Sequence, residues 1–213
     1  MTNVTAPAPK QDFVAGLLSY LVPGLGQAYQ GRIGKAILFF AGIYGLFFYG
    51  MALGNWQNVY LPQAIDSTNK APVSPTRDLF ARPQFLGQFW TGVVSWPAIA
   101  QYVNFDPKKS SGPLFGTWER TPYEAREGTP RDNRGGVKPE DAPADFHGMT
   151  IDEQQTNDDK GYDIGWVCTV VAGVLNILVI YDAFAGPAIS AETLAKAREE
   201  SRKHAEAATV PVA

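Results

Sequence analysis

Apolar residues are gathered into long runs without charge, and the charged residues lie between these runs. No Asp, Glu, Lys or Arg occurs in residues 13–31, 36–65 or 164–181. Amphipathic helices of soluble proteins instead carry charged side chains along one face. The segregation is typical of membrane proteins. It predicts an all-α membrane protein with three or four transmembrane helices and a long hydrophilic loop before the last helix.

The first two runs predict a helical hairpin of two membrane spans over residues 13–54, preceded by a disordered lead of residues 1–12. The run Phe13–Tyr29 has 17 residues, which is short for a hydrocarbon layer roughly 30 Å thick. Pro23 lacks a backbone donor and is expected to kink or end the regular helix. Ala36–Leu53 is the clearest span, because no charged face interrupts it.

A cleaved signal peptide is a second interpretation of the N-terminus. Lys10 precedes the apolar stretch FVAGLLSYLV, and the small-residue stretch GLGQA follows it, which is the order that signal peptides show. The lead carries one positive charge, and the next apolar run follows closely, so a retained helix is favoured. A mature protein beginning near Tyr29 would establish cleavage.

The third uncharged run, Phe85–Phe105, is ambiguous and follows a polar connector of residues 55–84. Gln88, Thr91 and other polar side chains dilute its hydropathy, and Pro97 interrupts it. The pattern predicts either a full span or a re-entrant or interfacial helix.

Residues 106–160 form a hydrophilic segment with eight Lys and Arg against twelve Asp and Glu. Because it has few apolar residues, we expect a partly disordered loop. Residues 161–187 contain the last span, whose uncharged part is Ile164–Tyr181. Residues 188–213 predict a charged, solvated tail.

Two polar residues in or beside the last span are candidate intramembrane groups, since polarity at membrane depth usually has a reason. Asn176, near the middle of the span, predicts an interhelical hydrogen bond. Asp182 either marks the water boundary or forms a buried ion pair with Arg32 or Lys35. The ion pair requires three crossings. With a fourth crossing at 85–105, Asp182 and Arg32 would lie on opposite faces.

The net charge of −3 and the scattered reactive groups indicate no particular chemistry. His147 and His204 are far apart in sequence, and no second ligand sits at metal spacing. The single cysteine, Cys168, excludes a disulfide within the chain. We therefore predict a protein that is not an enzyme, with no catalytic residues, cofactor or metal and no nucleic-acid partner.

The segment VPGLGQAYQGRIGKAILFF resembles the first half of the two-transmembrane (TM-two) domain superfamily. In that pattern a helix breaks at a glycine-rich turn, an aromatic-x-Gly-basic connector follows, and a second apolar helix begins. The matching residues are Pro23, Gly24, Gly26, Tyr29, Gly31, Arg32 and Lys35. The Asp-Arg-Phe or His-Arg-Phe element of the superfamily is absent.

A broader resemblance covers four blocks in order from Leu21 to Pro187. The blocks RPQFLGQFW, WPAIAQY and AGVLNILVIYDAFAGP, together with the first hairpin, resemble an uncharacterised planctomycete membrane family, the domain of unknown function DUF6677. The resemblance implies residence in a bacterial inner membrane as a multi-pass protein, and implies no activity.

Two functions remain open from the sequence. The first is a scaffold, assembly factor or accessory subunit that binds the lipid bilayer and a membrane-protein partner or a second copy of itself. The alternative is a component of a transporter or channel that acts as an oligomer, because proline-broken helices often form substrate sites.

Overall fold

The computed structural model describes residues 11–61, 76, 79–80, 82–104, 106, 112–119, 160–186 and 199–202. Most of the predicted N-terminal lead, hydrophilic loop and charged tail lie outside these residues, as do both histidines. Every regular element in the described part of the chain is a helix. The predicted all-α fold is confirmed for that part.

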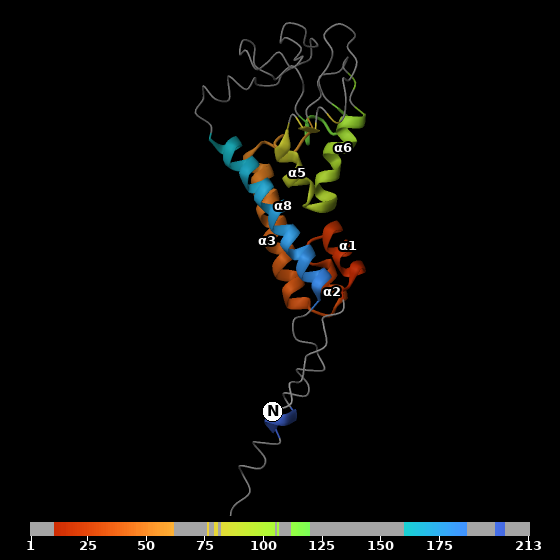
Figure 1. The fold of residues 1–213 in the computed structure, drawn as a ribbon. Coiled ribbons are helices and arrows are strands. Elements are labelled where there is room, and N and C mark those ends of the chain that lie inside the picture. Colours follow the sequence, from red (N-terminus) through yellow and green to blue (C-terminus); the bar gives the residue numbers. More distant parts are fainter. Residues whose placement is uncertain are drawn as a thin grey trace, which may run out of the picture.

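Two long antiparallel helices form the axis of the molecule (Figure 1). They are α3 (Ile33–Leu53) and α8 (Gly161–Ala185), with 21 and 25 residues. At 1.5 Å per residue they are about 32 Å and 38 Å long. Both are long and apolar enough to cross a membrane, and no third helix in the described residues meets that test.

The first apolar run folds into two short helices, α1 (Phe13–Leu21) and α2 (Leu25–Tyr29). Asp12 begins α1 by accepting a hydrogen bond from the backbone N–H of Ala15 at 3.1 Å. The chain reverses at Pro23 and at Gly24, which has φ 87°. The nine residues of α1 extend only about 14 Å. The structure therefore gives a half-length hairpin where the sequence predicted a first span.

The third uncharged run also forms a half-length hairpin. It consists of α5 (Pro83–Phe89), the 3-10 helix η1 (Gly92–Ser95) and α6 (Trp96–Val103). The chain turns at Gly92, which has φ 81°. Neither α5 nor α6 by itself is long enough for a full span.

The two hairpins approach each other from opposite ends of the α3–α8 pair (Figure 1). A methyl group added at Gly92 would overlap the carbonyl oxygens of Tyr20 and Leu21 at the end of α1. The Tyr20 ring lies 5.7 Å from the Phe89 ring and 5.9 Å from the Trp90 ring. The hairpin tips are thus in direct contact beside the middle of α8.

Close helix packing depends on a few glycines. A methyl group added at Gly50 of α3 would lie 2.6 Å from the carbonyl oxygen of Gly165 on α8. One added at Gly173 would overlap the carbonyl oxygen of Gly87 on α5. These contacts bring both α3 and α5 against α8. The apolar core beside them includes Ile43, Phe47, Met51, Phe85, Ala172 and Val179.

Candidate functional site

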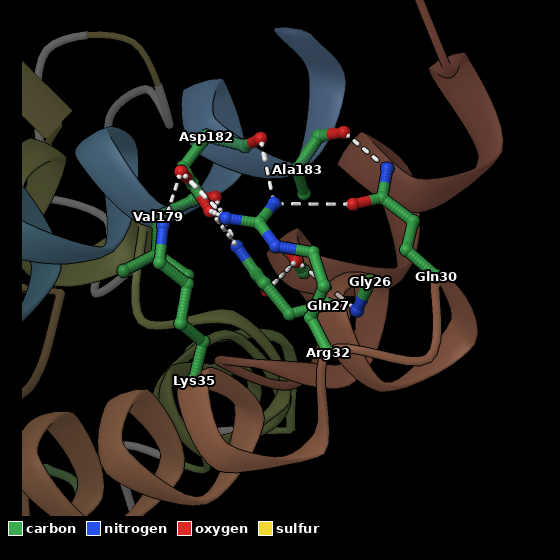
Figure 2. A network of polar contacts seen from close by, with 9 residues as sticks. Gly26, Gln27, Gln30, Arg32, Lys35, Val179, Asp182 and Ala183 are labelled. Carbon is green, nitrogen blue, oxygen red and sulfur yellow. Dashed lines mark hydrogen bonds and ion pairs between the residues drawn. The ribbon is translucent and has the colours of Figure 1, made fainter. Parts of the chain in front are cut away.

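An ion cluster lies where α3 begins and α8 ends (Figure 2). Asp182 of α8 lies 2.8 Å from Arg32 Nη2 and 3.0 Å from Lys35 Nζ. The sequence suggested a buried pair with one of these cations, whereas Asp182 pairs with both. The cluster is only partly buried, because the exposed side-chain fractions are 18% for Arg32, 29% for Asp182 and 49% for Lys35.

The antiparallel arrangement gives each charge in this cluster a favourable position. Arg32 and Lys35 lie at the N-terminus of α3, where the dipole of their own helix disfavours a cation. Asp182 is similarly disfavoured near the C-terminus of α8. Arg32 and Lys35, however, face the C-terminus of α8, whose dipole favours a cation. Asp182 faces the N-terminus of α3, whose dipole favours an anion. Gln30 adds a hydrogen bond of 2.7 Å from Nε2 to the carbonyl of Ala183, which satisfies an acceptor at the end of α8.

Gln27 connects the ion cluster to the first hairpin and is fully buried. Its Nε2 donates to the Val179 carbonyl at 2.9 Å and to Asp182 Oδ2 at 3.2 Å. Its Oε1 accepts from Ser19 Oγ at 2.9 Å, and Ser19 Oγ accepts from the N–H of Gly26 at 3.1 Å. This single amide therefore holds α1 and α2 against α8.

The predicted motif of the first hairpin has a structural explanation at most of its positions. Pro23 and Gly24 make the turn, and a methyl group at Gly24 would overlap the backbone of Ala36. Gly26 packs against the Ala15 carbonyl. Gly31, with φ 77°, reverses the chain before α3. Tyr29 is exposed.

Asn176 joins the tips of both hairpins to the middle of α8. It is fully buried, and its Nδ2 donates to the carbonyl oxygens of Ser19 at 3.2 Å and Trp90 at 2.8 Å. The sequence predicted an interhelical hydrogen bond, and the geometry has two. Within the described residues, Oδ1 of Asn176 has no hydrogen-bond partner.

A third polar cluster lies near the other end of the α3–α8 pair. Gln88 Nε2 donates to the Asn58 carbonyl at 3.0 Å and to Thr169 Oγ1 at 2.8 Å. Arg82 Nη2 donates to the same Asn58 carbonyl at 2.7 Å, and its guanidinium carbon lies 3.4 Å from the centroid of the Tyr60 ring. Polar contacts thus occur at both ends and at the middle of α8.

Several of these residues were not predicted as site residues. Ser19, Gln88 and Thr169 lie inside apolar runs. In the sequence, their polar side chains lower the hydropathy of the run but do not indicate which groups they bond to. One sequence signal was available. Pro23-Gly24-Leu25-Gly26-Gln27 and Pro97-Ala98-Ile99-Ala100-Gln101 share the proline, the glutamine four residues later, and small residues at the second and fourth positions. Both glutamines are buried, and Gln101 also bonds to a distant segment, through Nε2 to the Thr117 carbonyl at 2.8 Å.

The polar side chains of the described residues form a structural network between helices. Within these residues, no three His, Cys, Asp or Glu side chains gather as a metal site would require. The polar side chains donate mainly to backbone carbonyls of other helices. The arrangement can hold two half-length hairpins in place beside α8.

Comparisons with known proteins identify the chain by family. No curated protein and no solved structure matches it. A sequence model of a family of unknown function matches residues 14–196, which include both hairpins and both long helices. The chain therefore belongs to the family of unknown function DUF6677.

Proposed function

We propose that this chain is an integral membrane protein in which α3 and α8 cross the bilayer and each hairpin enters halfway from an opposite side. The supporting observation is the exposure of apolar side chains on both long helices. Only 33% of the apolar window of either helix is buried, whereas a core helix of a soluble protein would be mostly buried. Exposed side chains include Ile37, Leu38, Phe40 and Tyr49 on α3, and Val174, Leu175, Leu178 and Tyr181 on α8.

Helix length and interior polarity support the same proposal. Both long helices match or exceed a hydrocarbon layer roughly 30 Å thick. Non-helical backbone at membrane depth is tolerated where protein covers it, and the hairpin tips are covered by each other and by α8. α8 begins at Gly161, far from the N-terminus, so a signal sequence does not explain it.

The proposed location is the inner cell membrane, with the ion cluster on the cytoplasmic side. Arg32 and Lys35 lie at this end of α3, and the positive-inside rule favours the cytoplasm for such residues. In a membrane preparation, the protein should stay in the pellet after alkaline carbonate extraction and require detergent for release. Release by carbonate alone would contradict membrane integration.

Within the membrane, we propose that the protein acts as a scaffold, assembly factor or accessory subunit. The observation that carries this role is the fixed interior: Gln27, Asn176 and Gln88 each bond two groups on other elements. Because these interior side chains already bond to groups of this chain, a partner would bind to the outer surfaces. The segment around Phe115 is one such surface, because Phe115 is 92% exposed while Trp118 Nε1 donates to the Val94 carbonyl at 3.0 Å.

The scaffold role predicts a partner that co-purifies in mild detergent. Phe115→Ala should reduce recovery of that partner, and deletion of residues 121–159 should show whether the hydrophilic loop contributes too. Phe80→Ala is the matched control, because Phe80 is also largely exposed. Equal recovery from Phe115→Ala, the deletion and the control would contradict the role assigned to this end of the molecule.

A transporter or channel component is the second candidate. The buried polar atoms of the described part that lack a hydrogen-bond partner include Asn176 Oδ1, Gln88 Oε1, Asn58 Oδ1 and Arg82 Nη1. Opposed broken helices that meet at mid-depth form substrate sites in many transporters. Two crossings are too few for a path through one chain, so this function requires an oligomer. A strictly monomeric mass in native nanodiscs would contradict it.

A further inference from the structure

The ion cluster carries more positive charge than its carboxylate neutralises. Both oxygens of Asp182 are occupied: Oδ1 accepts from Arg32 Nη2 and Lys35 Nζ, each at 3.0 Å, and Oδ2 accepts from Gln27 Nε2 at 3.2 Å. Two cations thus share one saturated carboxylate. Because half of the Lys35 side chain is exposed, its ammonium group can bind a further anionic group from solution or from lipid.

Exposed apolar surface continues directly from this cationic group along α3. Leu38 and Gly42 follow Lys35 by three and seven residues, which places them on the same helix face. Leu38 is 67% exposed. A methyl group added at Gly42 or Gly45 would meet no atom within 4 Å. At these positions the helix surface is therefore uncovered, and no side chain projects from it. On α8, Leu178 and Tyr181 also expose large side chains close to Asp182.

This surface combines one excess positive charge at the end of the helix pair with an apolar track toward the middle. A free phosphate ion would use only the charge, whereas a phospholipid would use both parts. Basic groups between helices on the cytoplasmic side are suited to anionic headgroups. A zwitterionic headgroup brings its own cation and gains less from the excess charge.

We propose that Arg32 and Lys35 bind the phosphate of an anionic phospholipid, with one acyl chain lying along Leu38 and Gly42. The proposal rests on the proposed function as a membrane protein. Lys35 is the accessible donor, and Arg32 is held by Asp182 at the rear of the site. Removing one Lys or Arg charge should therefore weaken the binding of the anionic headgroup by about fivefold.

Native mass spectrometry of the full chain in detergent tests the site with added phosphatidylglycerol or phosphatidylcholine. Phosphatidylglycerol should bind more tightly to the wild type, and Lys35→Gln should reduce that binding by about fivefold while phosphatidylcholine binding changes little. Lys160→Gln is the matched control at the opposite end of α8 and should bind as the wild type does. Gly42→Leu should reduce the binding of both lipids by filling the track.

Three results would overturn the site. They are equal binding by Lys35→Gln and Lys160→Gln, no preference for phosphatidylglycerol, and displacement of the lipid by millimolar inorganic phosphate, which would indicate a free-anion site. Thermal unfolding of each variant in detergent shows whether it remains folded, and Lys35→Arg should restore binding. Carbonate extraction separates the two proposals: a protein that needs detergent but shows no effect of Lys35→Gln fails this proposal alone.

Discussion

Replacing Asn176 by leucine should weaken the junction between the two hairpins. The change keeps the number and branching of the side-chain heavy atoms but removes the donors to the carbonyl oxygens of Ser19 and Trp90. A buried acceptor left without a partner costs about 1–3 kcal/mol, while interhelical hydrogen bonds in membranes average about 0.6 kcal/mol. Asn176 Oδ1 is buried without a described partner, so removing this atom offsets part of the loss in the free energy of unfolding. We expect a loss of about 2 kcal/mol in the free energy of unfolding.

The assay is unfolding in mixed micelles with increasing sodium dodecyl sulfate, followed by intrinsic tryptophan fluorescence because Trp90 lies at the junction. Leu178→Ala is the control, since Leu178 is 64% exposed on the outward face of α8. Its unfolding free energy should change by less than about 0.5 kcal/mol. An Asn176→Leu variant as stable as the control would refute the role given to this amide.

The ion cluster, the contact of Gly92 with the end of α1, and the segment around Phe115 each give a further prediction. Asp182→Arg and Arg32→Asp should each lower the detergent melting temperature, and the double variant should recover part of the loss. Gly92→Ala should destabilise the protein by about 2 kcal/mol or more because its methyl group overlaps backbone, whereas Gly42→Ala, which has open space, should be neutral or slightly stabilising. Burial raises the pKa of Glu119, which favours the neutral acid in the folded state. The segment around Phe115, which includes Glu119, should therefore become more protease-sensitive as pH rises from about 4.5 through this raised pKa, and Glu119→Gln should remove the effect.

The sequence was sufficient for the helical class and for the helices that became α3 and α8. Long uncharged runs with no polar face are compatible with few structures other than long apolar helices. The pairing of Asp182 with Arg32 or Lys35 was one of two alternatives that the sequence left open, because it depended on the number of crossings. Asn176 was identified because an isolated amide in an apolar run needs a partner.

The hairpins were harder to predict because hydropathy does not distinguish one span from two half-length helices. Phe13–Tyr29 has the composition of a span, since both arms of the hairpin are apolar. Pro23 marked the break but not the reversal of direction, which depends on the left-handed conformation of Gly24 and on Gln27 bonding to α8. Such long-range contacts are not visible in a local pattern.

Cysteine accessibility at four positions tests the half-length hairpins most directly. In a Cys168→Ala background, Gln11→Cys, Gln57→Cys, Ser110→Cys and Glu200→Cys can each be labelled from either side of sealed membranes. Two crossings predict positions 11 and 200 on one face and positions 57 and 110 on the other. Opposite faces for positions 57 and 110 would mean that residues 85–105 cross the bilayer. If positions 57 and 110 share a face, labelling of positions 11 and 200 from opposite faces would mean that residues 13–29 cross it. Either result would contradict the opposed half-length hairpins.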